Sequence, residues 1–209
     1  MTSHLKILTK CEYELYMDYK KADQLPFDPR PQLSRIFVEG FYPWIKHFSR
    51  DKEQLIAAFS HTFDLRCFYI AMENDEIAAM AACTDGNAPV FLDRKIFIQT
   101  MGVLRGCYTY YVLGRYIRNS GYPFKLSRTT GSIEYVATAE AYQGRGIAQG
   151  LLTHIINTEV YTAYVLEFAD TNTTAFRLYE RLGFKEIDRK KAPRRRNGGV
   201  NYFIYMRRG

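Results

Sequence analysis

The clearest change in hydrophobic spacing along the chain lies between residues 133 and 156. Ile133, Tyr135 and Val136 are the β-branched and aromatic types that suit a pleated, buried surface, and they predict a strand. Apolar residues then recur at intervals of three and four, which predicts a helix through Ile147, Leu151, Leu152, Ile155 and Ile156. A polar turn over residues 143–148 connects the two, and we expect the fold to be arranged around this unit.

Outside this unit, periodicity and turn residues predict further elements on both sides. They are a strand at 5–8, helices at 11–22, 33–47 and 52–63, strands at 67–72, 77–84 and 164–169, and a final strand at 200–206. Residues 25–31 form a loop, because three prolines within six residues break helices and central strands. Asp51 and Gln54 resemble a capping box before one helix, and Asn74-Asp75 favours a tight hairpin turn.

A second strand-to-helix unit follows the run at 164–169. Asp170 and Asn172 are helix-start residues and Gly183 is a natural helix end, so a helix is expected between them. On that helix Asn172, Ala175 and Tyr179 are separated by three and four residues and therefore share one face.

The turn at 143–148 has the chemistry of a phosphate site. Gly144 and Gly146 let the backbone come close to a ligand because they carry no Cβ. The helix that follows presents unpaired N–H groups and the positive end of its dipole. A P-loop would need Lys-Ser or Lys-Thr after the glycines, and none follows. The dinucleotide fingerprint also fails, because its third glycine, Gly150, falls one residue late.

A third phosphate-binding pattern, Gln/Arg-x-x-Gly-x-Gly/Ala, is satisfied by Gln143, Gly146 and Ala148. It resembles the central motif of the GNAT N-acetyltransferase superfamily, which binds the pyrophosphate of acetyl-CoA. Nearly two dozen residues later, the pattern Asn-x-x-Ala-x-x-Leu-Tyr-x-x-x-Gly-Phe, from Asn172 to Phe184, matches the other hallmark of that family. Two motifs in the right order and separation are far more specific than either one.

The resemblance covers roughly residues 67–84 and 130–206. It implies an α/β fold with a GNAT-type mixed, largely antiparallel central sheet flanked by helices, and an extra helical segment before the central strand. We expect a single domain, 1–209, made of an N-terminal strand and helices on the acceptor side at 1–65, a helical insertion at 92–119, and an acetyl-CoA-binding core at 130–184.

Residues 92–119 carry apolar and aromatic residues at helical spacing together with five arginines and lysines. We favour a helix packed against the sheet, because such stripes usually belong to the core. The alternatives are a wall of the acceptor pocket or a basic aromatic face on a membrane surface.

In that family the turn and the strand before it hold the acyl donor. The resemblance assigns cofactor binding here to Val136, Ala137, Thr138, Gln143, Gly144, Arg145, Gly146, Ile147, Ala148, Asn172 and Tyr179. Backbone groups of Val136 and Thr138 would pair with pantetheine as an added strand, and an N–H there would polarise the acetyl carbonyl. Asn172 would form a hydrogen bond with the pantetheine or pyrophosphate arm of the cofactor, and it could cap its own helix at the same time.

Acetyl transfer to an amine needs the free base. A lysine-like amine of pKa about 10.4 is neutral only about once in 2,500 at pH 7, equivalent to roughly 4.6 kcal/mol. Glu134 is the candidate general base, directly or through water, and its alternative is a surface carboxylate. The phenol of Tyr179 stays protonated at neutral pH and could donate to the departing thiolate. The resemblance gives Tyr179 this role of general acid, and its alternative is a core tyrosine.

Composition limits the other classes of function. The 209 residues, 47% of them hydrophobic, fit one ordinary domain and exclude a disordered chain. No apolar run is long enough for a membrane span, and the N-terminus lacks the apolar core of a signal peptide. The four cysteines are widely spaced and the four histidines are scattered. We therefore expect no metal, no disulfide framework, and reduced thiols in the cytoplasm.

The net charge of +7 comes entirely from residues 185–209, which hold nine lysines and arginines against two acids. A nucleic-acid-binding domain would more usually spread its basic residues over a face or along a helix. Arg194, Arg195 and Arg196 are most simply solvated loop residues, in a segment at 190–199 that joins the last two strands. They could also bind the CoA 3′-phosphate, an acidic acceptor or nucleic acid.

The favoured function is an N-acetyltransferase that moves an acetyl group from acetyl-CoA to a primary amine. Attack would be direct, in a ternary complex, because no cysteine lies near either motif in the sequence. Its partners would be acetyl-CoA and an amine-bearing acceptor, with a homodimer as an option. Two alternatives remain: a CoA-binding regulatory module without transfer activity, or a nucleic-acid-binding protein using the basic segment 189–196. The acceptor itself is not specified by any motif.

Overall fold

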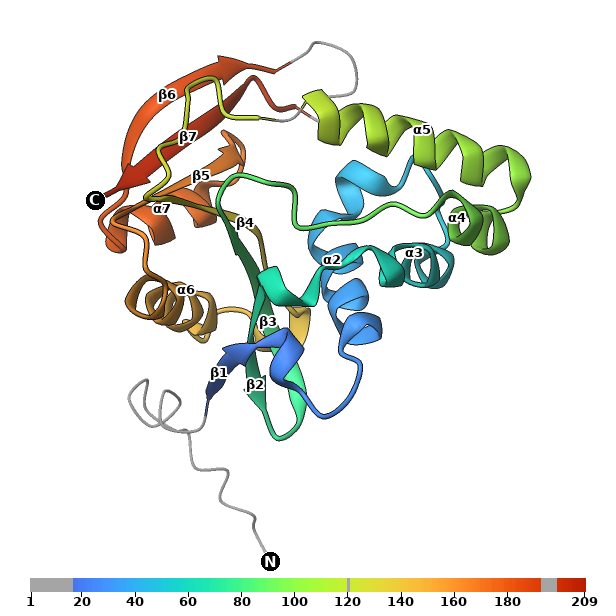
Figure 1. The fold of residues 1–209 in the computed structure, drawn as a ribbon, viewed down its shortest axis with the longest axis horizontal. Coiled ribbons are helices and arrows are strands. Elements are labelled where there is room, and N and C mark those ends of the chain that lie inside the picture. Colours follow the sequence, from blue (N-terminus) through green and yellow to red (C-terminus); the bar gives the residue numbers. More distant parts are fainter. Residues whose placement is uncertain (1–16, 120, 193–198) are drawn as a thin grey trace, which may run out of the picture.

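The computed structural model describes residues 17–119, 121–192 and 199–209, which form a seven-stranded sheet with helices on both faces (Figure 1). The strand order is β1-β2-β3-β4-β5-β7-β6. All neighbouring pairs are antiparallel except β4 and β5, which run parallel. The expected mixed, largely antiparallel sheet flanked by helices is therefore confirmed.

The strands are β1 (Asp18–Lys21), β2 (Phe68–Glu73), β3 (Glu76–Thr84), β4 (Thr130–Thr138), β5 (Ala163–Ala169), β6 (Lys185–Lys191) and β7 (Tyr202–Arg208). The α-helices are α2 (Arg30–Ile45), α3 (Lys52–Phe59), α4 (Arg94–Met101), α5 (Val103–Asn119), α6 (Ile147–Thr158) and α7 (Thr173–Arg181). Short 3-10 turns are η1 (Ala22–Gln24), η2 (Ser60–Thr62), η3 (Leu65–Cys67) and η4 (Glu140–Tyr142). Strands and helices alternate only from β4 to β6, whereas α2–α3, β2–β3, α4–α5 and β6–β7 are consecutive elements of one kind.

The N-terminal prediction is wrong where the structure describes it. The strand expected at 5–8 and the first half of the helix expected at 11–22 lie outside the described residues, but residues 18–21 form strand β1. This strand pairs antiparallel with β2, with Tyr19 opposite Ala71. Pairing with a sheet edge supplies the backbone hydrogen bonds that a short helix would otherwise have to make alone, so tertiary contact outweighs local periodicity.

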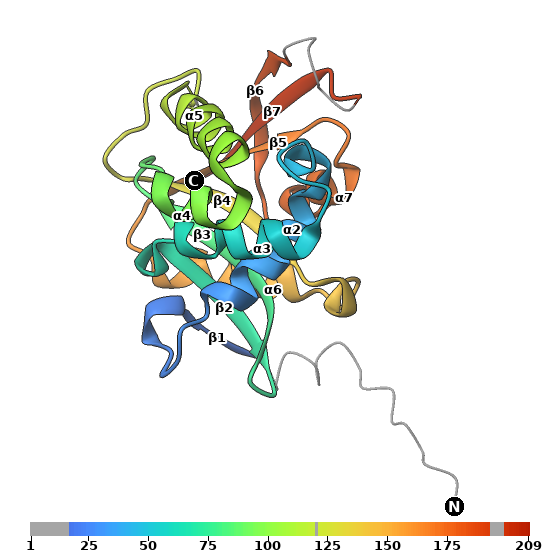
Figure 2. The ribbon, with the colours of Figure 1, turned by 90° about the vertical axis from the view of Figure 1, so that its right-hand side faces the viewer.

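The sheet separates two hydrophobic cores. On one face, α6 and α7 bury a cluster that includes Ile147, Leu151, Leu152, Ile155, Tyr179 and Leu182. On the other face, α2, α3 and α4 bury a second cluster that includes Leu33, Phe37, Leu55, Phe59 and Phe97. The 90° view in Figure 2 shows α2 and α3 in front of the sheet. Side chains alternate along each strand, which sends neighbouring residues into different cores.

The 92–119 segment is two helices and not one. Gly102, with φ of 79°, breaks the run between α4 and α5. Helix α4 contributes Phe97 and Met101 to the second core. Helix α5 packs on α4 and leaves Leu104 89% exposed, so the expected packing on the sheet holds for only part of the segment. Within the described ranges, no helix combines the length and the apolar character needed to cross a membrane.

The start of α3 shows how the sequence signal for a helix cap is realised. The Asp51 carboxylate accepts hydrogen bonds from the backbone N–H groups of Glu53 and Gln54, as an N-cap should. In a capping box the side chain at Gln54 would accept a hydrogen bond directly from the Asp51 N–H. Here Ser49 connects the two, because its hydroxyl accepts from the Asp51 N–H and donates to the Gln54 side chain. The predicted cap is confirmed, with Ser49 as an additional residue in its hydrogen-bond network.

Replacing Asp51 with alanine should lower the free energy of unfolding by about 1 kcal/mol, because the first turn of α3 loses its side-chain acceptor. Urea titration followed by circular dichroism measures this. Asp51→Asn is the matched control, since asparagine also caps helices and should keep most of the stability. Equal stability of the alanine and wild-type proteins would contradict the assignment.

Candidate active site

Strand β4 departs from regular geometry at Tyr135. On its β3 side, Glu134 lies opposite Ala82 and Ala137 opposite Met80, so two residues of β4 face one residue of β3. This β-bulge places Tyr135 at φ of 54°, a left-handed conformation that is uncommon for an aromatic residue. Such a conformation costs roughly 1–3 kcal/mol and persists only where the surroundings fix it.

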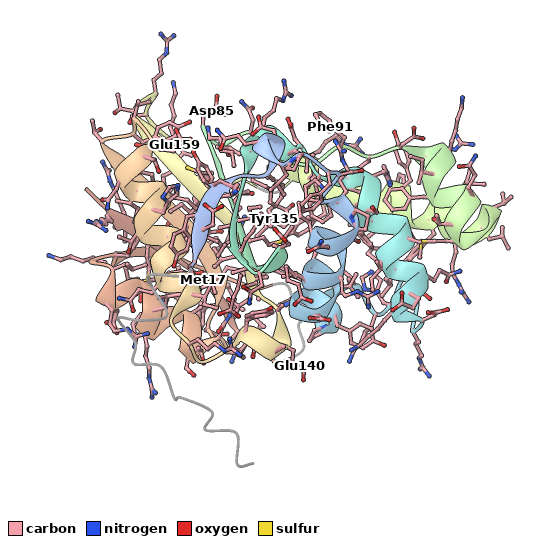
Figure 3. All side chains as sticks on the ribbon, turned by 90° about the horizontal axis from the view of Figure 1, so that it is seen from below. Met17, Asp85, Phe91, Tyr135, Glu140 and Glu159 are labelled. Carbon is pink, nitrogen blue, oxygen red and sulfur yellow. The ribbon has the colours of Figure 1, made fainter. Side chains whose placement is uncertain are left out.

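The ring of Tyr135 is the anchor of this bulge. It lies between the sheet and α2 (Figure 3), with ring centroids 6.1 Å from Phe37, 6.2 Å from Phe41 and 6.0 Å from Phe68. Helix α2 approaches β4 closely at Gly40, where a Cβ would stand 3.3 Å from that of Ala137. The aromatic contacts therefore offset the backbone strain and fix β4 against α2.

Strands β4 and β5 part immediately before the bulge. Their pairing runs from Thr130–Ala163 to Ile133–Leu166 and then stops, although β5 continues to Ala169. The Ala139 N–H donates to the Ala78 carbonyl of β3. By alternation, Val136 and Thr138 direct their backbone groups toward the β5 side. An inner strand thus presents backbone donors and acceptors to a gap, where an extended ligand could complete the pairing.

The carboxyl end of β4 leads into the glycine turn. Gly144 and Gly146 have φ of 77° and 79°, so both require the left-handed conformation that glycine tolerates. Gly146 is the N-cap of α6 and no side chain caps that end. The first N–H groups of α6 therefore remain available to an anion, as the sequence predicted.

Gly150 has a packing role and not a phosphate role. A Cβ at this position would stand 2.1 Å from the Tyr19 hydroxyl oxygen, so a side chain here would displace the Tyr19 ring where β1 crosses α6. This explains a third glycine that fits no dinucleotide fingerprint.

The polar side chains of the turn are held by neighbours. Arg145 forms an ion pair with Glu73 at 3.2 Å and lies over the ring of Tyr142, 5.0 Å from its centroid. Gln143 donates to the Thr138 carbonyl at 3.2 Å. These contacts tie the turn to the β2–β3 hairpin and to the end of β4, so its shape is fixed before a ligand arrives.

The remaining residues of the turn differ in what they can offer. Ile147 is buried in the first core and can contribute only its backbone, and Ala148 is half-buried beside it on α6. An open recess of about 430 Å³ adjoins this end of β4, lined by Glu39 of α2 and by Ala139, Glu140 and Ala141. Figure 3 shows Glu140 at the edge of the molecule there.

Helix α7 places the second motif on the same side of the sheet as α6. Asn172 is exposed and its Oδ1 accepts from the Ala175 N–H at 3.0 Å, so the predicted cap forms and the side-chain NH₂ still faces solvent. Tyr179 is only 5% exposed, with its ring centroid 5.4 Å from that of Phe168. Within the described residues its hydroxyl has no hydrogen-bond partner. Burial raises its pKa, so this phenol keeps its proton and can act as a donor.

Glu134 belongs to a short hydrogen-bonded chain on the opposite face. The Ser132 hydroxyl donates to the Glu134 carboxylate at 2.7 Å. Because Ser132 has one proton to donate, it must accept from the Tyr122 hydroxyl, which is also 2.7 Å away. Burial raises the pKa of Glu134, the Ser132 hydrogen bond opposes that rise, and the negative charge of Glu167 adds to it. A carboxylate with a raised pKa is a stronger base, which suits general-base chemistry.

Sequence reasoning missed Ser132, Tyr122 and Glu167. Ser132 could have been found, because residues two apart on a strand share a face with Glu134. Tyr122 and Glu167 come from the loop after α5 and from β5, and only the tertiary fold brings them beside β4.

Cys83 is also closer to the site than the sequence indicates. The β3–β4 pairing places it opposite Ile133, one residue before Glu134. The thiol is buried in the first core, and burial raises its pKa to about 12. It therefore stays protonated and is a poor nucleophile.

Comparison with known proteins identifies the class. The profile of the acetyltransferase (GNAT) family matches residues 30–184 of the chain. The chain belongs to the GNAT acetyltransferase family. The comparison with curated proteins gives no match.

Solved structures share the fold at low sequence identity. An N-acetyltransferase from Staphylococcus aureus Mu50 aligns with a TM-score of 0.59 and 15% identity, covering 91% of this chain and 100% of that one. The ribosomal-protein-S18-alanine N-acetyltransferase from Escherichia coli gives 0.52 and 16%, covering 91% and 92%. The protein yncA from Salmonella typhimurium, solved with its cofactor acetyl-CoA, gives 0.52 and 16%, covering 92% and 93%.

The raised pKa of Glu134 predicts a pH-dependent stability. The folded protein binds this proton more tightly than the unfolded chain does, so the stabilisation is present at low pH and is lost as the pH rises through the folded pKa. Glutamine does not ionise. As the pH is raised from about 5 to about 8, the free energy of unfolding of wild type should therefore fall relative to that of Glu134→Gln, as measured by urea titration. If the free energy of unfolding of Glu134→Gln minus that of wild type decreases or stays constant over this range, the burial effect is contradicted.

Proposed function

We propose that this GNAT family member transfers an acetyl group from acetyl-CoA to a primary amine by direct attack, with both substrates bound. The observation that carries the proposal is the gap between β4 and β5, which ends at an uncapped glycine turn. The gap offers strand-like backbone pairing and the turn offers anion-binding N–H groups. Pantetheine would need the strand-like pairing and the pyrophosphate next to it would need the anion-binding N–H groups, which is the order in which the gap and the turn follow each other.

The donor would be held largely by backbone. Val136 and Thr138, on either side of Ala137, would pair with pantetheine along the open edge of β4. The N–H groups of residues 143–148 would bind the pyrophosphate. Asn172 would add its side-chain NH₂, because its oxygen is already used in the cap. Arg145 would act chiefly through its ion pair with Glu73, which fixes the turn. The residues 130–184 would thus be the donor-binding core.

Acetyl-CoA supplies an activated acetyl thioester, and the chain has to manage two protons around it. The acceptor amine loses one when nitrogen attacks, and Glu134 would take it, directly or through water. The raised pKa of Glu134 brings the pKa of this carboxyl closer to that of the amine, so proton transfer from the ammonium to Glu134 is less unfavourable. A backbone N–H on the open edge of β4 would stabilise the charge that develops on the carbonyl oxygen.

Tyr179 would meet the departing sulfur as the general acid. A thiol has a pKa near 8.5, whereas an ordinary phenol is near 10 and burial raises the pKa of Tyr179 further. Complete proton transfer to a free thiolate would therefore be uphill, and the hydroxyl acts mainly by a strong hydrogen bond while the C–S bond breaks. An ammonium acceptor loses two protons overall: the thiolate takes up one from solvent to become the free thiol, and the other leaves Glu134 for solvent, so the reaction balances as ammonium plus thioester giving amide, thiol and one proton.

Direct attack is supported by the state of Cys83. An acyl-enzyme would need a thiolate near the donor, and the cysteine beside β4 is buried and protonated. Acceptor binding would fall to the α2 face of the sheet, with the 92–119 helices as part of its rim. The described residues do not include Arg194, Arg195 and Arg196, for which the sequence left open a solvated loop or a contact with the CoA 3′-phosphate, an acidic acceptor or nucleic acid.

Donor binding is tested at Gly144. Gly144→Ala should weaken acetyl-CoA binding at least about tenfold in isothermal titration calorimetry, because a Cβ disfavours the left-handed turn by about 1–2 kcal/mol and crowds the anion site. Gly102→Ala is the control, since Gly102 also has a positive φ of 79°, with ψ of 163°, and is remote from the turn. It should lose at least as much stability but keep its affinity for acetyl-CoA. Equal affinities of the two variants would refute the assignment of the turn.

The chemical role of Tyr179 is tested by removing only its oxygen. Tyr179→Phe should lower kcat for thiol release by about 100-fold with an accepted amine, because general-acid contributions are of that order. Acetyl-CoA affinity should change little, since the ring still fills the core. The assay is free CoA release across a panel of primary amines. Donor binding without any thiol release in wild type would favour the CoA-binding regulatory module instead.

A further inference from the structure

We propose that the acceptor carries a second positive charge, and that Glu167 binds it while Glu134 receives the reacting amine. This inference rests on the proposed function and narrows it to a substrate class: diamines, polyamines and other amines with a cationic group near the reacting nitrogen. It assigns a specificity role to a residue that neither sequence motif contains.

The two carboxylates are brought together by strand register. Ile133 of β4 pairs with Leu166 of β5, and both side chains belong to the core under α6 and α7. The next residue on each strand, Glu134 and Glu167, therefore points to the opposite face of the sheet. This is the position where the strands begin to part, next to the place where the acetyl group would lie.

Tyrosines from separate elements surround this pair. Tyr205 of β7 lies directly opposite Glu167 and shares a side-chain hydrogen bond with it. The Tyr205 ring centroid is 5.8 Å from that of Tyr122, which begins the hydrogen-bonded chain to Glu134. Aromatic faces and hydroxyls beside carboxylates are a favourable environment for an ammonium group. Glu167 is exposed overall, so a ligand can reach it from solvent.

The site lacks a counter-charge among the described residues. Neither glutamate forms an ion pair there, and the charged group that acts on Glu134 is Glu167 itself, which raises its pKa. Lys190 of β6 influences Glu167 but is not within ion-pair distance. Two neighbouring carboxylates without a cation repel each other, and that repulsion is relieved when a cation binds.

A single ammonium cannot supply this charge throughout the reaction. The reacting amine must become neutral before it attacks, and once its proton has passed to Glu134 a monoamine leaves the Glu167 carboxylate without a cation. A second ammonium on the acceptor stays charged through the transfer and can stay bound at Glu167. The acceptor would therefore lie with its reacting end at Glu134 and its second cation toward the solvent side.

Steady-state kinetics with matched acceptors test this. The probes are α,ω-diamines of three to eight carbons and the n-alkyl monoamines of the same lengths, each with saturating acetyl-CoA. At the best length, kcat/KM for the diamine should exceed that of the monoamine by at least about tenfold, the effect of one charge-assisted hydrogen bond. Having two amines per molecule accounts for only about a twofold gain on statistical grounds.

Glu167→Gln should remove this preference. It should lower kcat/KM for the diamine about tenfold more than kcat/KM for the monoamine, mainly through KM, because only the diamine loses a charge-assisted contact. Asp23→Asn is the charge control, because it removes one negative charge from the exposed η1 turn at the other edge of the sheet. It should leave the preference intact.

The outcomes separate the inference from the function it rests on. Acetylation of monoamines and diamines with equal efficiency at every length would overturn the inference and leave the acetyltransferase function standing. A diamine preference that survives in Glu167→Gln would also overturn it. If no amine releases CoA, titration calorimetry of diamines into the CoA-bound protein still decides: no binding, or binding unchanged in Glu167→Gln, rejects the second-cation site.

Discussion

The left-handed backbone of Tyr135 is the constraint on which the rest of the site depends. A regular β4 would continue its ladder with β5 and leave no gap for a ligand. The bulge interrupts that ladder, and rings from α2 and β2 hold the strained residue in place. The proposed binding site thus depends on withholding hydrogen bonds from the middle of a sheet, at a local cost that aromatic packing offsets.

The same distortion divides the work between the two faces of the sheet. The face under α6 and α7 carries Tyr179 and leads to the glycine turn, which suits a nucleotide thioester. The face under α2 carries Glu134 and Glu167 among tyrosine hydroxyls, which suits an amine. Both faces meet where β4 and β5 part, so the donor and the acceptor can reach one gap from opposite sides. Burial raises the pKa on both faces: it keeps the Tyr179 phenol protonated and makes the Glu134 carboxylate more basic.

Sequence signals predicted the structure correctly where an element is stabilised by contacts among its own neighbouring residues. The Asp51 cap, the Asn74-Asp75 hairpin turn and the Asn172 cap depend on residues within a few positions of one another, and all three form as predicted. Periodicity also predicted α6 and α7 and the faces they bury. Where the element depended on a distant partner, prediction failed: β1 was taken for a helix because its pairing with β2 is invisible locally.

The sequence by itself determined the family, and it identified the turn proposed to bind phosphate and the phenol and carboxylate proposed for catalysis, because these rest on short spacings and residue types. Only the tertiary structure decided that Ser132 and Tyr122 complete a chain to Glu134, that Cys83 lies beside the site as an inert thiol, and that Glu167 joins Glu134. The physical reason is register. Which residues of two strands share a face is set by how the strands pair, and a single-residue slip would send Glu134 and Glu167 to different sides of the sheet.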